Sequence, residues 1–114
     1  MYVFTVEGMQ IHKQPIKPED MLHDLQGYVH GHIEVVYPVN LRYPYLMVVN
    51  DSGLIDGMPS NYIASLLYGR RQHAQIICGP AVICKEVWTE DGPDLGPLDE
   101  SDFLSVLEQI YDVL

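Results

Sequence analysis

The chain has 114 residues, the size of one domain. Apolar residues make up 47 % and aromatic residues 10 %, including eight tyrosines, which is too much apolar content for a disordered chain. Six basic against 16 acidic residues give a formal net charge of −10. This charge argues against sequence-independent binding to nucleic acid, which needs clustered cations, and against binding to an anionic membrane surface.

No targeting or membrane segment is visible. The longest unbroken apolar run is residues 45–49, whereas a membrane helix needs about 20 apolar residues. The first residues lack the basic start and long apolar core of a secretory signal. Cys78 and Cys84 are too few for a disulfide framework, so we expect free thiols in the reducing cytoplasm of a host bacterium. The alternative is a piece of a secreted protein.

Strand signals, meaning β-branched and aromatic residues bounded by turn residues, occur along the whole chain. They cover residues 1–7, 10–13, 32–37, 45–50, 54–55, 75–78 and 81–88, the last two forming one or two strands. The run Asn50-Asp51-Ser52-Gly53 is typical of a turn, because Asn, Asp and Gly tolerate left-handed backbone. Residues 90–97, rich in acids, glycine and proline, are expected to form a loop.

Three helices are expected between these strands. Pro18 suits the first turn of a helix, and apolar residues follow it at helical spacing as far as Val29. Ser60 or Asn61 is a suitable cap for a second helix, which ends at Gly69. Asp99 is a suitable cap for the last helix, with Asp102 in an approximate capping-box position. The apolar stripe predicted for that helix comprises Phe103, Leu107, Ile110 and Leu114, widened by Leu104 and Tyr111.

The order of elements predicts one α+β domain over residues 1–114. Short returns between strands favour hairpins, and therefore an antiparallel or mixed sheet of about five strands with two to three helices packed on it. Neither a G-x-G-x-x-G nor a P-loop motif is present, which argues against a dinucleotide or P-loop fold. We divide the domain into a core, residues 1–88, and an acidic loop and helix, residues 89–114.

Four segments, in order, resemble one family. Residues 25–36 (LQGYVHGHIEVV) resemble a block L-Q-x-x-V-G-G-x-I-E-x-V, and residues 46–54 (LMVVNDSGL) resemble v-v-N-E-x-G-k-l. Residues 57–64 (GMPSNYIA) and 77–83 (ICGPAVI) match the next two blocks. These segments resemble the family called domain of unknown function 3846. The resemblance implies a small α+β domain from phages, plasmids or other mobile elements, and implies no activity.

The chain departs from that family pattern at two positions. His30 stands where the family usually has glycine, which alters the turn before the strand. Asp51 stands where the family usually has glutamate, which keeps the charge.

A first hypothesis places a small-ligand site at the strand ends. Glu34 is unexpected inside an apolar strand, and Asn50, Asp51 and Asn61 lie at a turn and a helix start, where amides and carboxylates read a ligand's donors and acceptors. The pair Arg70-Arg71 is suited to clamp a phosphate or carboxylate. The alternative is structural: Glu34 faces solvent, Asn50 makes a turn, Asn61 caps a helix, and the two arginines are solvated.

A second hypothesis concerns metal. The spacing His30-x-His32-x-Glu34 offers two imidazoles and a carboxylate to zinc, with His23 folded over from the preceding helix. Nothing in the sequence fixes that geometry, so we assign no metal and no cofactor.

A third hypothesis is a protein interface. Tyr43 and Tyr45 flank Pro44 in a tyrosine-rich region, and tyrosine is enriched at interfaces. The segment from Glu86 onward carries nine acids and no base, so Glu100, Asp102 and Glu108 are candidates to present carboxylates to a basic protein. The alternatives are strand propensity for the tyrosines and a solvated helix face for the acids. An edge strand also allows self-association into a homo-oligomer.

The sequence favours a non-enzymatic accessory protein of a phage or mobile element that acts on a host system by stoichiometric binding. Its ligand in this hypothesis is a small nucleotide-like signal. The first alternative is an acidic inhibitor, resembling DNA in charge, of a host defence or nucleic-acid-binding protein. The second alternative is a small enzyme, although no serine lies in a G-x-S-x-G elbow and neither cysteine has a recognisable histidine partner.

Overall fold

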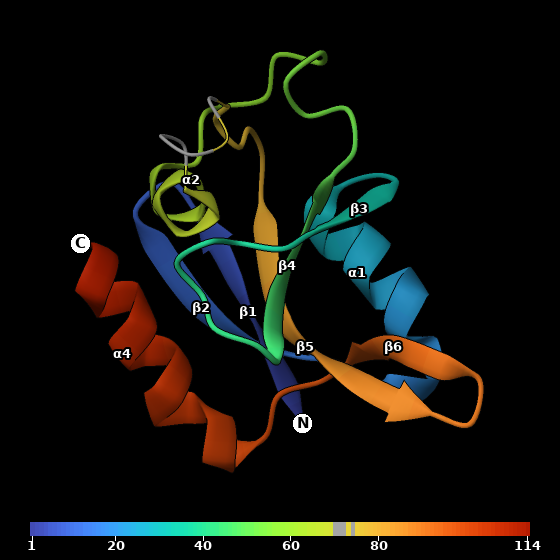
Figure 1. Cartoon of the computed structure of the whole chain (residues 1–114). Helices are drawn as coiled ribbons and strands as arrows, with labels where there is room; N and C mark the ends of the chain where they lie inside the picture. The colour runs from blue at the N-terminus through green and yellow to red at the C-terminus, as the bar shows by residue number, and fades with distance from the viewer. Residues whose placement is uncertain (70–72, 74) are drawn as a thin grey trace.

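Strand β5 (Ala81–Thr89) is the central strand of an antiparallel sheet (Figure 1). The computed structural model describes residues 1–69, 73 and 75–114. In these residues the sheet has six strands. Five of them follow the order β2-β1-β5-β4-β3, and the sixth, β6, pairs with residues 85–89 of β5. The other strands are β1 (Tyr2–Glu7), β2 (Gln10–Pro15), β3 (Ile33–Val36), β4 (Tyr45–Asn50) and β6 (Gly92–Gly96).

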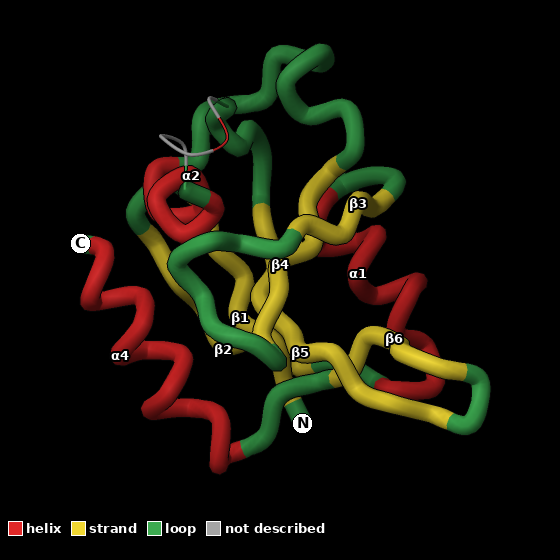
Figure 2. Tube along the Cα trace, viewed as in Figure 1, coloured by secondary structure: helices red, strands yellow, loops and turns green. Residues whose placement is uncertain are grey.

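Helices cover both faces of this sheet (Figure 2). Helix α1 (Met21–Val29) packs on one face against β4 and β5. Helices α2 (Tyr62–Tyr68) and α4 (Phe103–Val113) pack on the other face. Single 3-10 turns lead into α1 and α4, at η1 (Pro18–Asp20) and η2 (Glu100–Asp102). The predicted α+β class is therefore confirmed, with an antiparallel sheet.

The three inner strands are apolar on both faces because each face has a helix to bury it. Successive strand residues point to opposite sides, so in β5 Val82 and Cys84 pack towards α1, whereas Ala81 and Ile83 pack towards α2 and α4. All four side chains are fully buried. Complete burial of an aliphatic side chain of this kind contributes roughly 1.5–3 kcal/mol.

The helix ends follow the sequence signals. The Asn61 side chain accepts a hydrogen bond from the Ala64 amide at the start of α2, and Gly69 ends that helix with φ at +90°. Asp99 and Asp102 form the expected capping box ahead of α4. Helix α1 runs through Gly27 and ends at His30, which adopts the left-handed conformation with φ at +64°.

The structure corrects four expectations. Leu54 and Ile55 form an exposed turn rather than a return strand. Residues 75–78, expected to form a strand, make only an isolated β-bridge between Cys78 and Ser60. Residues 92–96, expected in a loop, form β6, because β5 extends past β1 and its free edge accepts a hairpin partner. In α4 the buried residues are Val106, Gln109 and Ile110, while three residues of the predicted stripe are exposed: Leu104, Tyr111 and Leu114.

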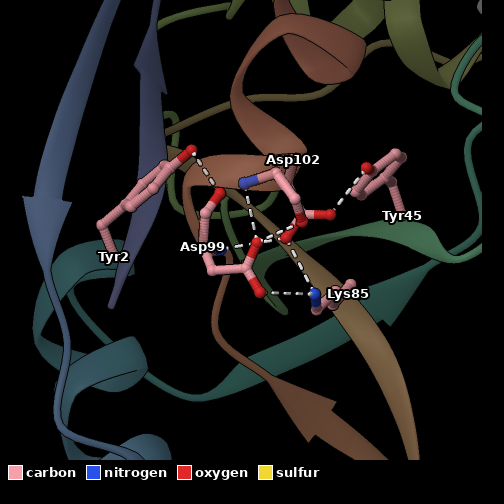
Figure 3. A network of polar contacts seen from close by, with 6 residues as sticks. Tyr2, Tyr45, Lys85, Asp99 and Asp102 are labelled. Carbon is pink, nitrogen blue, oxygen red and sulfur yellow. Dashed lines mark hydrogen bonds and ion pairs between the residues drawn. The ribbon is translucent and has the colours of Figure 1, made fainter.

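Asp102 connects the start of α4 to the sheet (Figure 3). One carboxylate oxygen accepts a hydrogen bond from the Tyr45 hydroxyl at 2.8 Å. The other accepts from Lys85 Nζ at 2.8 Å and from the Asp99 amide at 2.9 Å. Nearby, the Tyr2 hydroxyl donates to the Asp99 carbonyl at 3.1 Å. The cluster therefore ties strands β1, β4 and β5 to one helix start.

Protonation equilibria in this cluster favour an ionised Asp102 carboxylate beside a charged Lys85. Burial alone raises the pKa of Asp102, but hydrogen bonds from Lys85, the Asp99 amide and Tyr45 outweigh burial and leave that pKa below its ordinary value. The hydrogen bond to Asp102 raises the pKa of Lys85, and burial raises the pKa of Tyr45. The Asp102 contribution to stability is thus present at neutral pH and lost as pH falls through its lowered pKa. The Lys85 and Tyr45 contributions are lost only at alkaline pH.

We predict that Asp102→Asn lowers the free energy of unfolding by about 3 kcal/mol at neutral pH, because Lys85 loses its buried counter-charge. The variant should also lose less stability than the parent on acidification, since the lowered pKa is gone. Chemical denaturation at several pH values measures both effects. Glu100→Gln is the control: its pair with Lys13 at 2.7 Å is exposed, so about 1 kcal/mol or less is expected. Equal losses in both variants would contradict an anchoring role for Asp102.

Candidate ligand-binding pocket

A pocket of about 460 Å³ opens beside the turn between β1 and β2. Four separate segments line it. They are the hairpin turn (Glu7, Gly8, Gln10), the end of α1 (His30), the loop before α2 (Met58, Pro59, Ser60, Asn61) and the loop before β5 (Gly79, Pro80). Ligand pockets of small molecules have volumes in this range and combine apolar walls with a few polar groups.

Asn61 holds three of these segments together at the wall of the pocket. Its amide nitrogen donates to the carbonyls of Val6 at 2.7 Å and Gly79 at 2.9 Å. Its amide oxygen accepts from the Ala64 amide at 3.2 Å, and its side chain is almost completely buried. Both donors are used within the fold, so Asn61 shapes the pocket and has no free N–H for a ligand.

The same region depends on two further backbone contacts. The Gly8 carbonyl accepts from the Ile63 amide at 3.0 Å, which fixes the hairpin turn against α2. Gly79 has φ at +92°, and a Cβ atom there would lie 2.6 Å from Met58 Sδ. Glycine at this position therefore allows Met58 to lie against the loop before β5.

His30 is the residue of the pocket with the least favoured backbone. It is the one residue other than glycine with positive φ among those described, and its exposed side chain lines the pocket. A left-handed conformation costs a side-chain-bearing residue about 1–2 kcal/mol, although histidine tolerates it better than most. Strained residues are concentrated at functional sites, so His30 is the strongest candidate for ligand contact in this pocket.

The other predicted ligand residues lie elsewhere. Asn50 is buried and donates to the Val29 and His30 carbonyls at 3.0 and 3.3 Å, while its oxygen accepts from the Ser52 amide at 2.9 Å. It therefore fastens the end of α1 to β4. Glu34 and Asp51 are exposed and line a separate crevice of about 80 Å³. Arg70 and Arg71 lie outside the described residues.

The structure does not assemble the metal hypothesis. Among the described residues, no group of three His, Cys, Asp or Glu side chains is placed to share an ion. His30 lies at the end of α1 and His32 precedes β3 (Ile33–Val36), so of the three residues only Glu34 lies on the strand. Cys78 and Cys84 are free and buried, and burial raises the pKa of Cys84 to about 12.

The predicted interface residues have different environments. Tyr43 is 69 % exposed, and its hydroxyl accepts a hydrogen bond from Trp88 Nε1 at 3.0 Å. Glu100 and Glu108 are exposed. Tyr45 and Asp102 bind each other within the fold, and Asp102 is only 6 % exposed. Asp102 is therefore corrected from a surface acid to a structural one.

Sequence reasoning missed most of the pocket. Pairing of β1 with β5, which are far apart in the chain, brings Pro80 beside the hairpin turn that holds Glu7 and Gln10. Two signals point to the region in retrospect: Pro59 and Pro80 lie in family-like segments, and His30 is a departure from the family pattern.

Fold and pocket together define a small antiparallel α+β domain with one candidate ligand site at the end of its sheet. The chain belongs to the family described as domain of unknown function (DUF3846), whose pattern matches residues 1–110. The family resemblance is thereby confirmed and extends through most of α4. No curated protein and no solved structure matches the chain. No helix in the described residues is long and apolar enough to span a membrane.

We predict that Asn61→Asp lowers the free energy of unfolding by about 3 kcal/mol, because a carboxylate would face the Val6 and Gly79 carbonyls without a donor. The cap to α2 is retained in this variant, so the loss reports the two donated bonds. Asn40→Asp is the matched control: Asn40 donates one exposed bond to the Leu66 carbonyl at 2.8 Å, and less than about 1 kcal/mol is expected. Thermal or chemical denaturation measures the loss of stability in both variants. Equally small losses in the two would refute the role given to Asn61.

Proposed function

We propose that this chain is a non-enzymatic binding protein that captures a small nucleotide-like ligand, one molecule per site, in the pocket beside the β1–β2 turn. The observation that carries the proposal is the convergence of four segments on one opening of about 460 Å³. Both apolar and polar residues line it, as in sites for small organic ligands.

The lining suits a planar heterocycle with polar edges. Met58, Pro59 and Pro80 offer apolar surface for the faces of a ring. Gln10 and His30 offer donors and acceptors for its edges, and the Glu7 carboxylate is an acceptor for an amino group. The phosphate part of a nucleotide needs a cation, and Arg70 and Arg71 remain the predicted source of it.

The biological setting belongs to the same proposal. A phage or mobile-element accessory protein that acts on a host system works by capture when it is made in excess over its ligand. Stoichiometric capture needs no catalytic group. In the cytoplasm of a host bacterium the retained ligand would be a soluble signal rather than nucleic acid, since the net charge of −10 repels a polyanion.

Native mass spectrometry of gently purified protein, repeated after denaturation, tests the proposal. We expect an added mass of a few hundred daltons that is released on denaturation, with absorbance near 260 nm. The double variant His30→Gly/Gln10→Ala should lose this mass while keeping its stability, because glycine relieves the left-handed strain at position 30.

The matched control is Glu34→Ala/Asp51→Ala, which alters the separate crevice. It should retain the ligand. Loss of the added mass in this control and not in the pocket variant would move the site to the crevice and refute the pocket. A parent protein that carries no added mass and binds no nucleoside or nucleotide in titration would refute capture altogether.

A second candidate function is an acidic inhibitor of a basic host protein, and the outer side of α4 favours it. Leu104 and Tyr111 are 68 and 67 % exposed and lie seven residues apart, so they share a helix side with Glu108. Exposed apolar residues beside carboxylates suit a basic partner. Asp102, being buried, takes no part.

Charge reversal at the exposed acids separates the second candidate from the first. We predict that Glu100→Lys/Glu108→Lys abolishes any inhibition of a host nucleic-acid-binding protein and leaves retention of the small ligand unchanged. Reversal at Glu19 and Asp20, two exposed acids of η1, is the control for net charge. Inhibition that falls equally in both variants would show a general charge effect and refute a binding face on α4.

A further inference from the structure

The sheet face that carries α1 is not covered to its end. Beyond α1 a groove of about 210 Å³ crosses strands β3, β4, β5 and β6. Its apolar lining includes Val35, Tyr37, Leu46 and Leu95. Leu46 is 2 % exposed, and Tyr37 is 67 % exposed. The groove therefore has a buried apolar floor and an exposed aromatic side chain at its rim.

A second exposed aromatic residue adjoins this groove. Trp88 is the only tryptophan of the chain and is 69 % exposed. It pairs across β5 and β6 with Pro93, which also lines the groove. Its indole N–H donates a hydrogen bond to the Tyr43 hydroxyl. Tryptophan and tyrosine are enriched among the residues that carry most of the binding energy at protein interfaces.

The charges around the groove are negative. Glu86 and Asp94 line it, and its described lining contains no lysine or arginine. Lys85, next in sequence to Glu86, is on the opposite face of β5 and binds Asp102. Glu90 and Asp91 add two exposed acids at the turn of the β5–β6 hairpin. A partner segment that carries lysine or arginine would therefore complement this groove.

We propose that this groove docks a basic and apolar segment of another protein. An apolar side chain of that segment packs on Leu46 and Val35 beside Tyr37, and its cations lie against Glu86. Asp94 pairs with Val87, so its side chain starts from the opposite face of β6 and is given no role. A second copy of the chain fits less well, because a two-fold contact here would bring the carboxylates of both copies together. This inference is independent of the pocket beside the β1–β2 turn, since the two linings share no residue.

Selection from a library of random 12-residue peptides displayed on phage tests the inference, with the whole chain as bait. We expect enriched peptides to combine lysine or arginine with leucine, isoleucine or phenylalanine. Titration of a synthetic enriched peptide should change the fluorescence of Trp88. The variant Glu86→Gln should weaken binding by about tenfold, because it removes the charge that faces the groove and preserves shape.

Glu19→Gln is the matched control, since it removes the same single charge from η1 and should leave affinity within about twofold. Equal weakening in both variants would show a general charge effect and overturn the inference. Enrichment of acidic peptides, or no enrichment at all, would also overturn it. So would sedimentation that shows a dimer disrupted by Tyr37→Ser, because the groove would then be a contact between copies. Retention of the small ligand is unaffected by any of these outcomes.

Discussion

The constraint on which this fold depends is the burial of β1, β4 and β5 on both faces. An antiparallel sheet of this kind needs a helix layer on each side, and 114 residues supply only three α-helices among those described. Helix α1 covers one face, and α2 with α4 covers the other. Both candidate sites lie where the helices no longer cover the sheet. The pocket lies at the β1–β2 turn, and the groove lies beyond α1 on the sheet face that carries this helix.

Buried polar groups then fix how the helices sit on the sheet. Asn50, Asn61 and Asp102 each connect a helix end to a strand, and each uses its polar atoms within the protein. The described residues contain no buried side-chain nitrogen or oxygen without a hydrogen-bond partner. Such groups specify one arrangement of layers, since a helix displaced by one turn would leave them unpaired.

Local signals explain what the sequence could predict. The β-branched and aromatic residues of segment 1–7, the Asn61 and Gly69 caps and the Asp99–Asp102 capping box are all signals that act over a few residues. Strand β6 was not predictable, because its composition is typical of a loop and only the free edge of β5 makes it a strand. The amides of Asn50 and Asn61 point from sequence to ligand groups, whereas in the fold they donate to carbonyls 21 and 55 residues away. Local signals do not reveal these distant partners, nor that the turn with Glu7 and Gln10 lies beside Pro80.

The pairing of β1 has a consequence for how the molecule is made. Strand β1 pairs with β5, and the Tyr2 amide and carbonyl bond to Leu98 at 3.1 and 2.7 Å. During synthesis β1 therefore waits until β5 has been made before its second edge is paired. Non-local pairing of this kind slows folding, and an apolar hairpin with an open edge is prone to pair with other chains. The interval before β5 is available is therefore when the growing chain is most exposed to association with other chains.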